Sequence, residues 1–220
     1  MKITFIPGSK KIKEMVPCPV PARTVVPEWY KDIMINRDMP GIKNCIPFLD
    51  SLTSGYVQKT WTDIIVENHN GEITVELVDH DVEMIKERSS SSLPVQSDFY
   101  KKEFIWQRPW AIKLPEGYSS IITHPFNQID LPFMTLSAIV DSDKYYHANI
   151  GNIPFYIKSN FTGTIPAGTP MFQILPIKRE DWQLEELDYT AKFWYDRYIE
   201  KNLDKNYNTY KKRFWQRKNY

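Results

Sequence analysis

Hydrophobic and polar residues alternate most regularly within the first half of the chain. Ile73, Val75 and Leu77 are separated by single polar residues, which is the two-residue period of a half-buried β-strand. The apolar run 64–66 comes before them, and the turn between the two stretches contains Asn70-Gly71. An Asn-Gly pair readily adopts the positive φ angles that a tight hairpin needs. The pattern therefore predicts an antiparallel hairpin between these two stretches.

Short strands are expected along the rest of the central region as well. Strand character extends over 48–78, and later strands are predicted at 104–106, 111–113, 119–123, 135–140, 149–150, 155–158 and 171–175. Proline and glycine separate the later strands at intervals of about ten residues. This spacing is typical of an all-β sandwich, barrel or clip. We therefore predict one mainly β domain over residues 48–178.

The first 47 residues have a different pattern, because seven prolines interrupt them. Proline fixes φ and lacks the amide N–H that a helix interior requires, so no long helix is expected here. Apolar residues such as Phe5, Ile6 and Trp29 argue against a free linker. We expect residues 1–47 to form an extended, proline-rich strap over the core, with one short helical turn at 27–31.

A third pattern begins after Lys178. Trp182, Phe193 and Tyr198 belong to a set of apolar residues at about 3.6-residue spacing, and acidic residues lie near the start of that set. Acidic side chains stabilise a helix N-terminus through its dipole. We therefore predict that residues 179–220 form a C-terminal helix, which packs on the β-domain, and a basic aromatic tail.

The tail from Lys205 to Tyr220 contains six basic residues and no acidic residue, interleaved with five aromatic residues. Such a composition fits nucleic-acid binding through phosphate contacts and base stacking. It also fits a tail that Phe214 and Trp215 anchor while its lysines and arginines face water. We favour anchoring or a subunit contact, and nucleic-acid binding stays as an alternative.

The composition narrows the functional classes. The chain of 220 residues has 42% hydrophobic residues and a net charge of +1, so it supports a core but provides no overall attraction to nucleic acid or a membrane. Its two cysteines, Cys18 and Cys45, are too few for a disulfide framework. The N-terminus lacks the apolar region of a signal peptide. We expect a cytoplasmic protein without a membrane segment.

Three motifs occur in a fixed order in the central region. They are Leu-Pro-Glu-Gly-Tyr at 114–118, Ile-Val-Asp-Ser-Asp at 139–143, and Ile-Pro-Ala-Gly at 165–168 followed by Gln173. Together they resemble the LPxGY, GxIDxDY and IPxGxxxxQ motifs of the dUTPase and dCTP-deaminase family. The resemblance implies a compact, strand-rich β-clip fold, in which the position of Gln173 holds the clip together. It also implies a homotrimer, because the active sites of that family form between subunits.

The same resemblance implies a catalytic role for Asp141. In that family the matching acid orients or deprotonates the water that attacks metal-bound phosphates. Mg²⁺ and a nucleotide-like small ligand are therefore the cofactor and the ligand to expect if the chain is an enzyme.

Other positions depart from that family. Lys144 replaces the tyrosine of the base pocket and is followed by Tyr145, segment 123–127 stands in place of an Arg-Ser-Gly turn, and no glycine follows Gly168. These are the positions that would support the base, contact the phosphates and close over the nucleotide. We therefore predict that the ancestral catalysis has been lost.

A cluster of imidazole and carboxylate residues suggests a separate hypothesis. Side chains of this kind hold zinc or non-haem iron, and His124, Asp130, Asp141, Asp143 and His147 lie within 24 residues. We take Asp143 and His147 as candidates for a site that holds Mg²⁺ or a transition metal. The ligand-binding candidates are His124, Asn127, Asp130, Tyr145 and Gln173. The alternative is that these residues have ordinary roles in turns and at the rim of the sheet.

The whole chain also resembles uncharacterised proteins of phages and marine bacteria with a PxWYK arm, a PFLDxxTxGY segment and an IPxGTPxxQxxPxKR segment. Here these are residues 27–31, 47–56 and 165–179. We predict a non-catalytic β-clip protein with a binding or assembly role, in a host cytoplasm or a virion if a phage encodes it. Its partner is expected to be another protein or a second copy of itself. The alternatives are a metal-dependent hydrolase of nucleotides or related small molecules that uses Asp141, and nucleic-acid binding by the tail.

Overall fold

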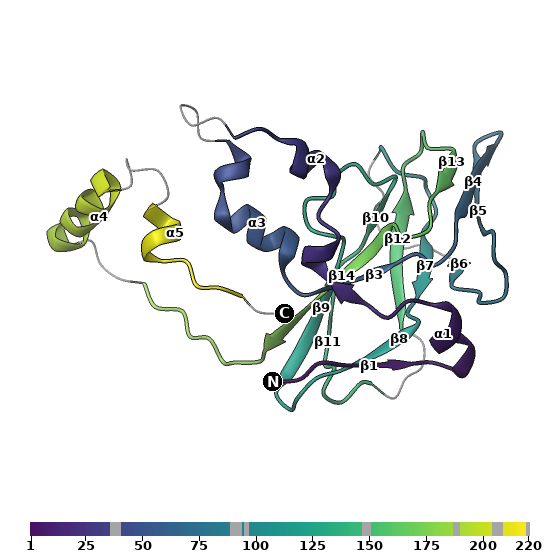
Figure 1. Cartoon of the computed structure of the whole chain (residues 1–220), viewed down its shortest axis with the longest axis horizontal. Helices are drawn as coiled ribbons and strands as arrows, with labels where there is room; N and C mark the ends of the chain where they lie inside the picture. Colours follow the sequence, from purple (N-terminus) through teal and green to yellow (C-terminus); the bar gives the residue numbers. More distant parts are fainter. Residues whose placement is uncertain are drawn as a thin grey trace.

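The computed structural model describes residues 1–35, 41–88, 94, 97–146, 151–186, 190–203 and 209–218 (Figure 1). Its strands form four sheets, and the paired strands run antiparallel. The predicted mainly β fold is therefore confirmed. Within the described residues, none of the four sheets closes into a barrel. The division of the chain into three segments stays a prediction.

The largest sheet positions the motif residues. Its strand order is β11-β9-β14-β3-β2, with β11 at Ala138–Val140, β9 at Tyr118–Thr123, β14 at Pro170–Lys178, β3 at Tyr56–Lys59 and β2 at Val20–Pro21. The central strand β14 ends opposite the start of β9, where Lys178 pairs with Tyr118. β11 also ends near the start of β9. The residues that follow β11 and β14 therefore meet at the start of β9.

A second sheet carries the aromatic core. Its order is β10-β12-β7-β6, with β10 at Phe133–Thr135, β12 at Asn152–Ile157, β7 at Phe104–Gln107 and β6 at Ile85–Glu87. Trp106 and Phe155 are fully buried, and their rings stack with centroids 3.6 Å apart. Trp106 Nε1 donates a hydrogen bond to Thr135 Oγ1 at 3.1 Å. The buried Trp106 side chain is therefore well packed, and its N–H group has a hydrogen-bond partner.

The predicted hairpin is confirmed. β4 (Ile64–His69) pairs with β5 (Glu72–Leu77), and β13 (Gly163–Ile165) pairs with the other side of β4. Asn70 has φ of 56° and Gly71 has φ of 91°, which are the positive angles that the Asn-Gly pair predicts. Ile64 and Leu77 lie opposite each other, and both are buried.

The N-terminal strap contains more regular structure than its prolines predict. β1 (Thr4–Pro7) pairs with β8 (Trp110–Lys113) in a two-stranded sheet. The strap also contains α1 (Lys10–Met15), η1 (Ala22–Thr24), α2 (Glu28–Asp32) and η2 (Ile42–Asn44). α2 confirms the predicted helical turn. α1 was not predicted, and it begins where Ser9 Oγ accepts a hydrogen bond from the Ile12 N–H at 3.1 Å.

The prediction of strand structure from residue 48 is wrong at its start. Residues Ile46–Thr53 form the helix α3 instead. Pro47 lies in the first turn, where a missing N–H removes no intrahelical hydrogen bond. Over so few apolar residues, periodicity does not distinguish a strand from a helix.

The single strand predicted at 135–140 is also wrong, because the chain changes sheets there. β10 ends at Thr135 in one sheet, and β11 begins at Ala138 in another. Between them the Leu136 N–H donates to the Pro154 carbonyl oxygen at 2.8 Å. The Ser137 hydroxyl is hydrogen-bonded to Thr123 Oγ1 at 2.7 Å. The segment between β10 and β11 is therefore hydrogen-bonded to both of the sheets that it connects.

The C-terminal helix begins later than predicted. Residues 181–186 have no regular structure, and α4 spans Ala191–Leu203 after Thr190 Oγ1 accepts a hydrogen bond from the Phe193 N–H. The side chains described in α4 are exposed, and Figure 1 shows the helix away from the sheets. The prediction that this helix packs on the β-domain is therefore wrong. α5 (Thr209–Arg213) follows. Across the described part of the chain, no helix is long and apolar enough to cross a membrane.

Candidate functional site

The predicted catalytic acid lies in a cluster at the start of β9. Asp141 and Asp143 follow β11, and Arg179 directly follows β14. Arg179 Nη1 donates to Asp141 Oδ1 at 3.2 Å and to Asp143 Oδ1 at 3.0 Å. Arg179 Nη2 also donates to Asp143 Oδ2. One guanidinium therefore bridges both carboxylates, and it meets Asp143 with two nitrogens.

Backbone and hydroxyl donors complete this cluster. The Gly117 N–H donates to Asp143 Oδ2 at 2.9 Å, and Ser119 Oγ donates to Asp141 Oδ1 at 2.7 Å. Arg179 also donates to the Tyr118 carbonyl oxygen at 3.1 Å. Gly117 and Ser119 lie at the start of β9 or just before it, whereas Arg179 follows β14. The cluster joins three neighbouring strands where they meet at one side of the sheet.

The electrostatics of the cluster suit a structural ion pair. The hydrogen bond from Arg179 lowers the pKa of Asp143 from 3.8 to about 2, although burial acts in the opposite direction. The same contact raises the pKa of Arg179. Asp143 is thus held as a carboxylate, and its side chain is buried beneath the guanidinium. A carboxylate that is so well paired is a poor proton acceptor.

His124 lies in a different place and is already fully hydrogen-bonded. Its Nε2 is 3.0 Å from the Gln128 carbonyl oxygen, and its Nδ1 is 3.3 Å from the Thr135 N–H. The first contact requires a ring N–H and the second an unprotonated nitrogen, so the neutral imidazole satisfies both. Burial lowers the pKa of His124, which favours this neutral form. With both nitrogens in use, His124 has none left for a metal.

Asn127 and Gln173 both bond to α3. Asn127 Nδ2 donates to Ser51 Oγ at 2.7 Å. Gln173 Nε2 donates to the carbonyl oxygens of Ser51 at 3.0 Å and Ser54 at 2.6 Å, while its Oε1 accepts from the Phe126 N–H at 2.8 Å. Gln173 is buried. These contacts hold α3 and the 126–128 turn onto β14, and they engage the amide of Gln173 at both its oxygen and its nitrogen.

The remaining candidates do not join the aspartates. Asp130 is exposed and follows His124 in the chain. Tyr145 is 54% exposed, and its backbone N–H donates to the Asp141 carbonyl oxygen. His147 lies outside the described residues. His124 follows β9 and Asp141 contacts its start, and five residues of strand separate them by roughly 16 Å. Among the residues that the structure describes, no group of three or more His, Cys, Asp or Glu side chains can hold a metal ion.

Arg179, the centre of the acidic cluster, is not among the predicted site residues. Arg179 directly follows the long strand β14. Strands that pair antiparallel bring the end of one beside the start of the next. The partner strand of β14, however, is not evident from the sequence, so the contact with Asp141 was not predictable.

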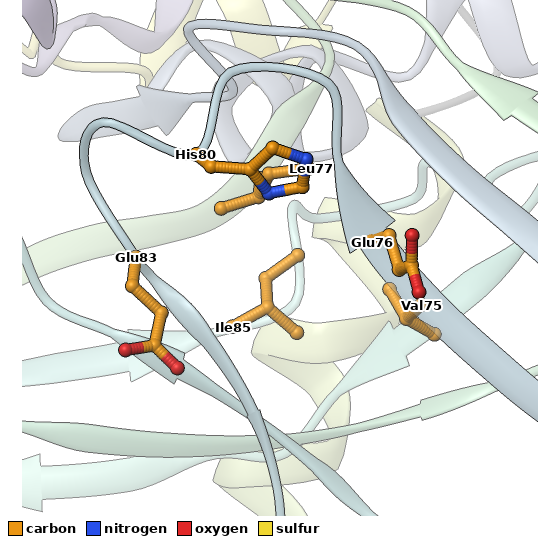
Figure 2. A pocket seen from close by; sticks show the side chains of 6 residues that line it. All are labelled: Val75, Glu76, Leu77, His80, Glu83 and Ile85. Carbon is orange, nitrogen blue, oxygen red and sulfur yellow. The ribbon is translucent and has the colours of Figure 1, made fainter.

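A separate pocket lies beside the hairpin. It has a volume of about 410 Å³ and is lined by Val75, Glu76, Leu77, His80, Glu83 and Ile85. Figure 2 shows Ile85 between Glu83 on one side and Val75 and Glu76 on the other, with His80 next to Leu77. Leu77 and Ile85 are buried, whereas the two glutamates and the histidine are exposed. None of the predicted site residues lines this pocket.

No protein-family model matches the chain, and no curated protein matches it. Similar solved structures include a variant of the dUTPase of Staphylococcus aureus phage phi11, which is 10% identical over 87% of this chain and 99% of that chain, with a TM-score of 0.39. A variant of the Staphylococcus bacteriophage 80alpha dUTPase is 10% identical over 86% of this chain and 90% of that chain, with a TM-score of 0.38. These neighbours are of the family that the motifs resemble, but likenesses at this level carry no argument about activity.

Proposed function

We propose that the chain is a non-catalytic β-protein with an assembly role, and that it self-associates through its C-terminal arm, residues 179–218. The observation that carries this proposal is the exposure of large apolar side chains along the arm. Trp182 is 86% exposed and Leu184 is 97% exposed. The other exposed members are Phe193, Trp194, Tyr195, Tyr198, Ile199, Tyr210 and Phe214. Single exposed apolar residues are ordinary, but a concentration of them in one segment is typical of an interaction surface.

The arm is fixed to the β-domain at both of its ends. At one end Arg179 bonds to Asp141 and Asp143. At the other end Trp215 Nε1 donates to Asp50 in α3 at 2.9 and 3.1 Å, and Lys218 Nζ donates to Asp50 at 2.6 Å. Trp215 thus provides the predicted anchor, whereas Phe214 is exposed. Attachment at both ends presents the middle of the arm to a partner at reduced entropic cost.

The charges of the arm favour a second copy as the partner. Its first part carries Glu180, Asp181, Glu185 and Glu186, and its last part carries Lys211, Lys212, Arg213, Arg217 and Lys218. In a two-fold interface the same surface must complement itself. Two arms that run in opposite directions place the acidic part of each copy against the basic part of the other. Aromatic side chains between these parts supply the apolar contact.

The acidic cluster supports a role without catalysis. Asp141 Oδ1 accepts hydrogen bonds from Ser119 and Arg179. Its carboxylate therefore stabilises the sheet and the start of the arm. The phosphate-binding and closing motifs are also replaced in the sequence.

Size-exclusion chromatography with light scattering tests the proposal. The double variant Trp182→Ser, Leu184→Ser should weaken self-association by about tenfold or more, because exposed aromatic and aliphatic anchors dominate interfaces. Ile129→Ser is the matched control, since Ile129 is 81% exposed but lies outside the arm. Its self-association should equal that of the wild type. A wild-type protein that stays monomeric at high concentration contradicts the proposal.

A further inference from the structure

Arg108 is an unusual buried residue that the proposed function does not use. It lies between β7 and β8, next to Pro109, and retains only 3% of its surface exposure. Its backbone N–H donates to the Gly151 carbonyl oxygen at 2.9 Å. The backbone of this residue is therefore well fixed, so the guanidinium starts from a defined position.

The guanidinium of Arg108 lacks the partners that a buried charge requires. Within the described part of the chain, the Nε and Nη2 atoms are buried and have no hydrogen-bond partner. Arg88 and Arg179, in contrast, each pair with a carboxylate. A buried charge without a partner is among the least favourable arrangements in a protein interior. Burial accordingly lowers the pKa of Arg108, although an arginine side chain stays protonated at neutral pH.

The backbone of Gly151 lies against the guanidinium of Arg108. A Cβ atom on Gly151 would lie 3.2 Å from Arg108 Cζ and 3.3 Å from Nε, which is tighter than an ordinary contact. Gly151 does not have a positive φ, so its backbone conformation does not require glycine. Instead, the absence of a side chain lets the backbone lie against the guanidinium. A larger residue would push Arg108 out of position.

Two other residues are relevant to this arginine. Trp110, two residues along the chain, has a buried Nε1 that also lacks a hydrogen-bond partner in the described structure. The exposed Tyr145 is close enough to interact electrostatically with the guanidinium. Arg108 thus carries two buried N–H-bearing nitrogens without a partner among the described residues, and both favour an acceptor of negative charge.

We propose that Arg108 anchors a binding site for a small oxyanion, a carboxylate or phosphate group. Nε and Nη2 form one edge of the guanidinium, and two oxygens of such a group accept from this edge in parallel. The ligand neutralises the buried charge and satisfies both donors. This site is independent of the acidic cluster and of the C-terminal arm.

Calorimetric titration of the full chain with inorganic phosphate, sulfate and acetate tests this site, at constant ionic strength with chloride as the reference anion. We expect saturable binding of one anion per chain. Arg108→Met removes the charge but keeps much of the volume, and it should weaken binding by about tenfold or more. Arg23→Met, at an exposed arginine, is the matched control and should bind like the wild type. Tighter binding of acetate than of phosphate assigns the site to carboxylates, and the reverse order to phosphates.

Two outcomes of the titration overturn the proposal. One is a wild-type protein that binds none of the three anions. The other is anion binding that survives Arg108→Met, which assigns it to other basic residues. If Arg108→Met does not fold, the arginine Nε–H resonance of the wild type decides. Its nitrogen and proton shifts should change saturably with the anion, and Gly151→Ala should weaken that response. A resonance that does not respond also overturns the proposal.

Discussion

The β-domain and the C-terminal arm use the same residue types in opposite ways. In the β-domain, Trp106 is fully buried and stacks on Phe155. In the arm, Trp182 is 86% exposed and the aromatic residues of α4 face solvent. Burial of apolar area stabilises the fold of the β-domain, so its aromatic residues are explained by folding. Trp182 and Tyr195 of the arm keep most of their surface exposed in the single chain, and contact with a partner explains this exposure.

The largest expected effect comes from Trp106→Ala. Removing a buried tryptophan leaves a cavity and takes one hydrogen-bond donor away from Thr135 Oγ1, and it should lower the free energy of unfolding by about 3–5 kcal/mol. Trp182→Ala should change it by no more than about 0.5 kcal/mol at concentrations where the chain is monomeric. Urea unfolding followed by circular dichroism measures both. Similar losses in the two variants would show that the arm packs like the β-domain, and the comparison would fail.

The sequence predicted the β-domain well because its signals are local. Alternation over Ile73–Leu77 and the Asn70-Gly71 turn fix the hairpin without any knowledge of the rest of the chain. The predictions for the α3 segment and for the segment after Thr135 were wrong. Long-range contacts with Gln173 and Pro154 determine the structure of these two segments. The sequence did not predict the late start of α4. The apolar spacing of the arm matches a helix, but the arm has no β-domain surface on which such a helix packs.

The candidate site was only partly predictable for the same reason. Motif order identified Asp141 and Asp143 as neighbours, and the structure does place them in one cluster. Their partner Arg179 is 36 residues from Asp143 in the chain, and strand pairing alone brings it there. Arg108 has no sequence signal at all, because its character depends on two buried nitrogens that lack a hydrogen-bond partner among the described residues.

The next largest effect concerns the second attachment of the arm. Asp50→Ala removes the acceptor of both Trp215 Nε1 and Lys218 Nζ, and it should lower the free energy of unfolding by about 1–2 kcal/mol. Asp50→Asn keeps an oxygen for Trp215 and should cost less. Limited proteolysis should cut the tail faster in Asp50→Ala than in the wild type. Unchanged cleavage in both variants would mean that this anchor does not hold the arm.

A smaller, pH-dependent effect is expected at the first attachment. The pKa of Asp143 is about 2 in the folded protein, below its ordinary value of 3.8. The carboxylate therefore stabilises the fold fully above its ordinary pKa, and this contribution is lost as pH falls toward about 2. Asp143→Asn should flatten the decline of melting temperature in that acid range. An equally steep decline in the variant would assign the acid sensitivity to other carboxylates.

The β-domain should respond in a different pH window, with a smaller effect. Burial lowers the pKa of His124 below 6.5 in the folded protein, so the unfolded chain binds this proton more readily. The neutral ring contributes its stability fully above that ordinary pKa and loses it as pH falls. His124→Gln should reduce the change in melting temperature between about pH 7 and about pH 5. His69→Gln, at an exposed histidine, is the control and should leave that change intact.

Charge exchange between copies tests the assembly proposal most directly. In one variant Glu185 and Glu186 become lysine, and in the other Lys211 and Lys212 become glutamate. These four side chains are exposed, so both variants should fold. Sedimentation equilibrium should show weaker self-association for each variant alone, because like charges then meet, and recovered association when the two are mixed. Variants that associate as the wild type does, or a mixture that gains nothing over its components, would contradict self-association through the arm.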